Sequence, residues 1–188
     1  YDPEKQVGLI VDEWGTWFTV EPGTNPGFLY QQNTMRDALV AGINLNIFNK
    51  HSDRVKMANI AQLVNVLQSV ILTDGPQMIK TPTYYVFKMF KDHQEATLVD
   101  SHIETEQIGL EDEYQVPNLS ESASIDADGR LQITIANLSA TDSYPVETRI
   151  VGFAGEKVSA EILTEEMHAM NTFENPNAVN VKAFDGVE

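Results

Sequence analysis

The first half of the chain alternates strand-like and helix-like segments, and this order limits the folds that it can adopt. The run VGLIV at residues 7–11 is continuously apolar and rich in β-branched side chains. Such a run is typical of a strand covered on both faces, as in a parallel sheet. Residues 55–62 (VKMANIAQ) alternate with a period of two and predict a second strand.

A helix is expected after each of these strands. Thr34 stands three residues before Asp37, which forms a box-like helix start, and apolar residues then recur at helical spacing until residues 49–51. The Thr-Pro pair that opens residues 81–93 predicts a second helix over that range. The apolar segment 64–72 fits either a strand or a helix.

Two strand–helix units do not make a closed structure. The apolar faces of the two predicted strands need neighbours that this sequence does not contain. Residues 1–96 are therefore expected to be part of a larger parallel α/β domain.

The character of the chain changes near residue 97. Short strand-like runs follow one another, and Asp128-Gly129 stands between two of them, which is a strong hairpin signal. The sequence predicts an antiparallel sheet over residues 97–188, arranged as a β-sandwich. The fold class is thus α/β plus all-β, and the strand-like runs are 97–105, 123–139, 144–153 and 157–165.

The net charge of −16 argues against nucleic-acid binding, because phosphate contacts need clustered Lys and Arg. The charge is uneven: residues 1–96 carry 8 basic and 10 acidic residues, whereas residues 97–188 carry 4 and 18. Two units with different surfaces explain this asymmetry, and the acidic half is most simply a well-solvated surface.

Several other classes of site are not expected. The chain has no cysteine, and its four histidines have no metal-ligand spacing, so neither a metal nor a cofactor is predicted. The DADG sequence at 126–129 lacks the downstream Glu of a calcium loop and predicts a hairpin turn. No stretch approaches the roughly 20 apolar residues of a membrane span. Because the chain starts at Tyr1 rather than Met, its natural beginning is expected elsewhere, and the compartment stays open.

The sequence GLIVDEWGTW places two carboxylates, Asp12 and Glu13, directly after the first apolar run. Trp14 and Trp17 follow them. In parallel barrels, functional groups lie at the carboxyl ends of the strands, and aromatic faces suit sugar rings. The same spacing also fits a capping or salt-bridging acid beside two core tryptophans, so the residues alone leave both interpretations open.

A longer stretch of sequence favours the functional interpretation of Asp12 and Glu13 over the structural one. The segments VGLIVDEWGTW, LYQQNTMRDALVAG, HSDRVKMANIAQLVN and TPTYYVFKMF occur in this order between residues 7 and 93. Together they closely resemble the α-L-arabinofuranosidases of glycoside hydrolase family 51, with a weaker likeness continuing to TFENPNAVNVKAFDG near the end.

The resemblance implies a retaining glycosidase with a (β/α)₈ barrel and an attached β-sandwich. Residues 1–96 would be the last two βα units of the barrel, and 97–188 an incomplete sandwich. The family nucleophile corresponds to Glu13. Gln62 corresponds to an amide that hydrogen-bonds the arabinofuranose, and Trp17 to an aromatic residue lining the pocket, whereas Trp14 is expected to pack behind the nucleophile. These three are the candidate substrate-binding residues. A helix-capping amide at Gln62 and a core role for either tryptophan are the alternatives.

A retaining enzyme needs a second carboxylate, and the family's Asn-Glu acid/base pair does not occur in the barrel part of this sequence. The chain is therefore expected to be a fragment of an exo-acting enzyme that releases terminal α-L-arabinofuranosyl residues from arabinan, arabinoxylan or their oligosaccharides. The fragment alone is expected to be inactive. The resemblance also implies a homo-oligomer for the intact enzyme.

Two alternatives stay open, and the first of them belongs to another functional class. The chain could serve as a non-catalytic carbohydrate-binding or structural β-sandwich module, which needs only an aromatic, hydrogen-bonding surface. It could also belong to a different glycosidase on the same barrel, since strand-end nucleophiles are widely shared.

Overall fold

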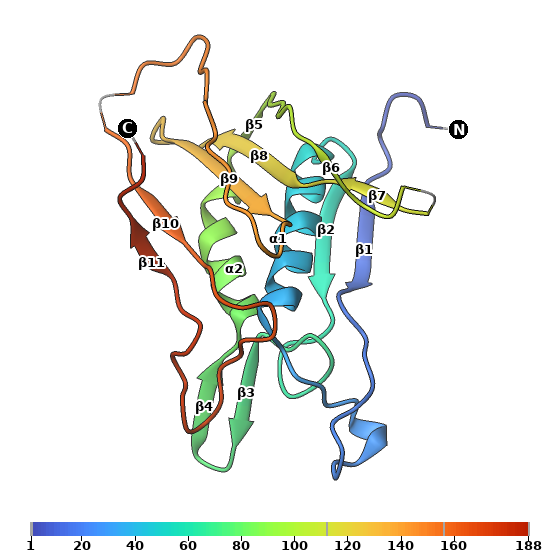
Figure 1. Ribbon diagram of the computed structural model, residues 1–188. Helices are drawn as coiled ribbons and strands as arrows, with labels where there is room; N and C mark the ends of the chain where they lie inside the picture. Colours follow the sequence, from blue (N-terminus) through green and yellow to red (C-terminus); the bar gives the residue numbers. More distant parts are fainter. Residues whose placement is uncertain (1, 112, 156, 188) are drawn as a thin grey trace.

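The computed structural model describes residues 2–111, 113–155 and 157–187 of the 188-residue chain. Strands β1 (Leu9–Trp14) and β2 (Val55–Ile60) pair in parallel, and helix α1 (Met35–Lys50) connects them and lies beside them (Figure 1). This confirms the predicted strand–helix–strand unit. Leu9 and Ile10 are 48% and 53% exposed, so the expected cover on both faces of β1 is absent within the described residues.

The position of β1 differs from the prediction over 7–11. The strand begins at Leu9 and runs through the acidic pair to Trp14, where it pairs with Ile60. The pairing with β2 is irregular between Val11 and Trp14 and resumes at Trp14, so the strand extends past the point where the side chains become polar. Glu13 therefore lies inside the last residues of the strand rather than beyond it.

Helix α1 starts where its capping sequence predicts. The Asp37 carboxylate accepts hydrogen bonds from the Thr34 backbone N–H at 2.8 Å and from the Thr34 hydroxyl at 3.0 Å. This satisfies a donor that the helix itself leaves unpaired. The helix ends at Lys50, within the predicted range.

Helix α2 (Pro82–Phe90) begins after Thr81 and continues as a short 3₁₀ turn over Lys91–His93, as predicted. It packs against α1 in an apolar core. The buried members of this core are Met35, Ala38, Ala41, Val86 and Val179.

The ambiguous segment 64–72 is neither a strand nor a helix over most of its length. Local side-chain bonds replace a ladder: Asn65 Oδ1 accepts from the Thr73 backbone N–H at 2.8 Å, and Ser69 Oγ from the Val66 N–H at 2.7 Å. Such bonds compete with regular structure. The segment then enters an unpredicted antiparallel hairpin of β3 (Ile71–Asp74) and β4 (Gln77–Lys80).

The second half is antiparallel, as predicted. Strands β5 (Thr97–Val99), β8 (Leu119–Ile125) and β9 (Leu131–Asn137) form one sheet in the order β5-β8-β9. The Asp128-Gly129 pair lies in the turn between β8 and β9, which confirms the hairpin signal. Two further pairs are β6 (Gln107–Gly109) with β7 (Gln115–Pro117), and β10 (Ala160–Ile162) with β11 (Lys182–Phe184).

The predicted strand over 144–153 is wrong, because the structure places no strand there. Its apolar residues Ile150 and Val151 are exposed. A strand needs a partner backbone to complete its ladder, and none of the described residues pairs with this segment. The runs 97–105 and 157–165 are also shorter than expected, with three strand residues each.

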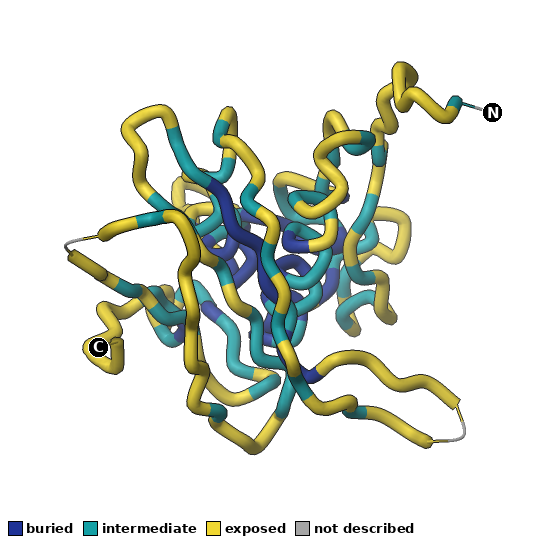
Figure 2. The backbone as a smooth tube through the Cα atoms, turned by 90° about the horizontal axis from the view of Figure 1, so that it is seen from above, coloured by how far each residue is buried: buried dark blue, intermediate teal, exposed yellow. Residues whose placement is uncertain are grey.

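Polar side chains join the helices to the sheet. Asn46 on α1 is buried, and its Nδ2 donates to the Ser120 carbonyl oxygen at 3.0 Å. Its Oδ1 accepts from the hydroxyls of Ser122 and Thr134, both at 2.8 Å. Figure 2 shows the buried residues gathered in the middle of the molecule, with exposed backbone in the outer loops.

The ring of His93 contacts two hydroxyl groups of the sheet, those of Ser124 and Thr134. The Thr134 hydroxyl gives its proton to Asn46, so its oxygen is left to accept from His93 Nε2 at 3.2 Å. His93 Nδ1 lies 2.7 Å from the Ser124 hydroxyl. Burial lowers the pKa of His93 and so favours the neutral ring, with its proton on Nε2 and with Nδ1 accepting from Ser124.

His93 should make the free energy of unfolding depend on pH. Burial lowers the pKa of His93 from its ordinary value of 6.5, against an opposing effect of Asp92. The stability that depends on the neutral ring is therefore fully present above pH 6.5 and is lost as the pH falls through the lowered pKa. His93→Asn should destabilise most at about pH 8 and least at about pH 5, as measured by urea unfolding.

A His93→Asn gap that stays constant over the same pH range would contradict the assignment of a neutral ring.

Candidate functional site

Glu13 and Gln62 lie at the same end of the parallel pair. Glu13 is the penultimate residue of β1, and Gln62 follows β2 by two residues. The two strands stay joined there, since the Ala61 backbone N–H donates to the Trp14 carbonyl oxygen at 2.9 Å. Both side chains are exposed. A carboxylate and an amide are thus presented together at the carboxyl edge of the sheet.

Trp14 points away from this edge, toward the helices. Its ring meets Phe48 of α1 edge-on at 5.3 Å between centroids, and stacks on Phe87 of α2 at 6.1 Å. The half-buried Trp14 thus packs on the helices, whereas the side chain of Glu13 before it is exposed. The Nε1 of Trp14 is buried without a hydrogen-bond partner among the described residues.

Trp17 stands on the irregular segment after β1 and is 69% exposed. The segment starts at Gly15, whose φ of +140° is a conformation that favours glycine. The added Cβ of any other residue would lie 2.9 Å from the Gln68 Oε1 atom. The backbone directly after the strand, at Gly15, therefore lies close to the buried amide of Gln68.

The described ranges contain no cluster of three or more metal-ligating side chains. None of the helices within them is long and apolar enough to cross a membrane.

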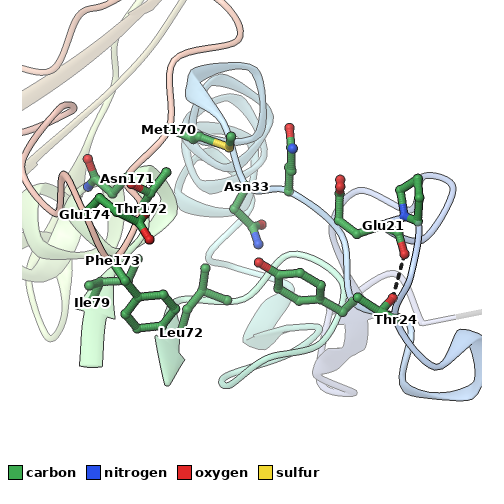
Figure 3. Close-up of a pocket in the computed structure, with 13 residues that line it drawn as sticks. Glu21, Thr24, Asn33, Leu72, Ile79, Met170, Asn171, Thr172, Phe173 and Glu174 are labelled. Atoms are coloured by element: carbon green, nitrogen blue, oxygen red, sulfur yellow. Dashed lines mark hydrogen bonds between the residues drawn. The ribbon is translucent and has the colours of Figure 1, made fainter. Parts of the chain in front are cut away.

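A pocket of about 350 Å³ lies near the same end of the molecule. Figure 3 shows side chains from three segments facing one another across it: the loop 21–33, the β3–β4 hairpin and residues 170–174. Buried Asn33 lines the pocket, and its Oδ1 has no hydrogen-bond partner in the described part of the chain. Glu13, Gln62 and the two tryptophans are not among the lining residues.

Comparison with known proteins places the chain in a family. Residues 12–188 match the model of the α-L-arabinofuranosidase C-terminal domain. The whole chain is 46% identical to the intracellular exo-α-L-arabinofuranosidase of Bacteroides ovatus and covers 37% of that protein. The chain belongs to the family 51 α-L-arabinofuranosidases. This confirms the resemblance that the sequence motifs indicate.

Solved arabinofuranosidases share its fold. The structure superimposes on the family 51 enzyme of Xanthomonas axonopodis pv. citri with a TM-score of 0.86 and 45% identity, covering 99% of this chain and 38% of that one. The enzyme of Thermotoga maritima, solved as an arabinose complex, gives a TM-score of 0.80 and 30% identity, covering 94% of this chain and 38% of that one. The chain thus spans little more than a third of the length of these arabinofuranosidases.

Sequence reasoning missed the groups that hold the strand end of this arabinofuranosidase domain in place. Gln31 and Gln68 are buried, and their side chains accept hydrogen bonds from the backbone N–H groups on either side of Trp17. They are 37 residues apart, and neither belongs to a motif that predicts such a role. Thr16 and Asp37 complete the group, and of the four only Asp37 carries a sequence signal, its position at a helix start.

The pKa of Tyr30, which lines the pocket, can be tested by substitution of the nearby carboxylates. Burial raises the pKa of Tyr30 above its ordinary value of 10.0, and the nearby Glu21 carboxylate raises it further. Glu21→Gln should therefore lower the pKa of Tyr30 only part of the way, because burial, the larger cause, remains. An ultraviolet titration of tyrosinate, with Tyr30→Phe as the baseline, measures this. Glu174→Gln removes the other pocket carboxylate, and an equal shift there would contradict the assignment to Glu21.

Proposed function

We propose that this chain carries the nucleophile side of the active site of a retaining, exo-acting α-L-arabinofuranosidase. The observation that supports this most directly is the shared position of Glu13 and Gln62, both exposed at the carboxyl edge of two parallel strands. Enzymes built on parallel barrels keep their reacting groups at this edge. The name of the Bacteroides ovatus relative agrees with the exo-acting α-L-arabinofuranosidase class.

The proposal includes the barrel. Residues 1–96 would be the last two βα units of a (β/α)₈ barrel. Parallel sheets are normally covered on both faces. Here Ile10 and Met57 on the two paired strands are each 53% exposed. Apolar side chains in this position suit a sheet that continues into further strands and a packed barrel interior.

It also includes the β-sandwich over residues 97–188. The face of the β8–β9 hairpin that carries Ser122 and Thr134 meets the helices. On the opposite face, Ile133 and Ile135 of β9 are 43% and 46% exposed. An apolar face opposite a bonded one is what a second sheet would cover in a sandwich.

The chemistry assigns one role to each group. The Glu13 carboxylate attacks the anomeric carbon of the terminal arabinofuranosyl unit, and the bond to the leaving oxygen breaks as an acid, a second carboxyl group about 5–5.5 Å away, protonates it. Water then releases the sugar from Glu13. Gln62 would hydrogen-bond the sugar hydroxyls, and the ring of Trp17 would pack on an apolar sugar face.

The proposed role of Trp14 is to support the nucleophile. Of the three predicted substrate-binding residues, it is the one whose ring packs between two helices. The substrate class is the terminal α-L-arabinofuranosyl groups of arabinan, arabinoxylan and their oligosaccharides.

Substitution of Glu13 tests the proposal. In the intact protein, Glu13→Gln should reduce kcat on an aryl α-L-arabinofuranoside by about 10³-fold or more, since it removes the attacking carboxylate. The neighbouring exposed carboxylate gives the matched control, and Asp12→Asn should keep most of the activity. In Glu13→Ala, added azide should restore turnover and give the arabinosyl azide of inverted anomeric configuration.

Retention of activity in Glu13→Gln would refute the nucleophile assignment. Absence of hydrolysis by the intact wild-type protein, together with binding of arabino-oligosaccharides, would favour a non-catalytic binding module instead.

A further inference from the structure

Two buried glutamines hold the backbone on both sides of Trp17. Gln68 Oε1 accepts from the Thr16 backbone N–H at 2.8 Å, and Gln31 Oε1 accepts from the Phe18 backbone N–H at 2.7 Å. Gln31 Nε2 also donates to the Thr16 carbonyl oxygen at 3.2 Å. The residue before Trp17 and the residue after it are therefore both fixed by side chains that lie fully inside the protein.

The glutamines are themselves fixed from behind. Gln68 Nε2 donates to the Asp37 carbonyl oxygen of α1 at 2.7 Å and contacts the Thr83 hydroxyl of α2 at 3.3 Å. The Thr16 hydroxyl donates to the Asp37 carboxylate at 2.5 Å. Because a carbonyl oxygen accepts the Nε2 proton, the orientation of the Gln68 amide is defined. The strand-end segment is thus tied to both helices.

The side chain of Trp17 makes little packing contact that could hold this segment in place, so the hydrogen bonds from the glutamines are its main support. Its side chain is 69% exposed, and residues 16–20 have no regular secondary structure. Backbone groups in such a segment must find partners elsewhere, and here two buried amides supply them. An exposed aromatic ring is thereby presented from a backbone that is hydrogen-bonded on both sides of it.

We infer that Gln31 and Gln68 are positioning residues of the proposed glycosidase, which set the places of Trp17 and Glu13. The inference rests on the proposed function. Gln31 acts through Trp17, since it bonds to the residues on either side of it. Gln68 lies closer to the strand end, because its Oε1 is the atom that a side chain at Gly15 would meet. Displacements of about 1 Å at such groups can cost about 10²-fold in rate.

The two glutamines should have separable kinetic effects. Gln31→Met keeps the size of the side chain but removes its bonds, so it should mainly raise KM, as expected for weaker packing on the sugar. Gln68→Met should in addition lower kcat, because it loosens the strand end that bears Glu13. In each case kcat/KM should fall about 10- to 100-fold. Gly15→Ala, which pushes the Gln68 amide aside, should resemble Gln68→Met.

A double-mutant cycle with Trp17→Ala separates positioning from stability. If Gln31 acts through Trp17, then Gln31→Met should change kcat/KM far less in the Trp17→Ala background than in wild type. All assays are made on the intact protein, well below the thermal midpoint of each variant. Gln32 is the exposed neighbour of Gln31, and Gln32→Met should leave kcat and KM unchanged.

Two results would overturn the inference. One is a lower thermal midpoint with unchanged kcat and KM, which is the signature of a purely structural role. The other is an equal effect of Gln31→Met with and without Trp17. In either case Glu13→Gln still reports on the proposed function, so that the loss of one conclusion is distinguishable from the loss of the other.

Discussion

The carboxylate of Asp37 is the group on which the arrangement of the first half depends. It is fully buried and accepts hydrogen bonds from the Thr34 backbone N–H, the Thr34 hydroxyl and the Thr16 hydroxyl. A buried charge is tolerated only when it is paired and hydrogen-bonded in this way. Arg36 adds a positive charge 3.6 Å from the carboxylate and places its guanidinium over the ring of Phe18. One turn of helix therefore defines both the start of α1 and the path of the chain after β1.

The parts of this arrangement that are local in sequence could be predicted. Thr34 and Asp37 are three residues apart, and the Asp128-Gly129 turn is formed by adjacent residues, so each carries its own signal. The parallel pairing of the two apolar runs followed from the helix between them. The end of β1 could not be predicted from the side chains, because its pairing with β2 is irregular across the acidic residues and resumes at Trp14.

The parts of the fold and of the site that could not be predicted depend on contacts between residues distant in the sequence. Gln31 and Gln68 look alike in sequence to the exposed Gln32, and only the fold shows which glutamines are buried. The same limit explains the segment 144–153, whose alternation suits a strand although no described backbone pairs with it. For the candidate site, Glu13 and Gln62 were chosen through a family resemblance, and the structure adds their common edge. The two tryptophans share a motif, yet one packs on helices and the other is exposed.

The contact between the helices and the β8–β9 sheet is made by an amide, an imidazole and hydroxyl groups. The stabilisation from such a polar contact changes with temperature in a different way from that of an apolar contact. Apolar burial weakens on cooling, and its exposure raises the heat capacity of unfolding. A hydroxyl-rich contact exposes little apolar area when it opens, so it adds little to that heat capacity. Its contribution should therefore persist in the cold, at temperatures where the apolar core around Ala38 and Val86 has begun to lose its advantage.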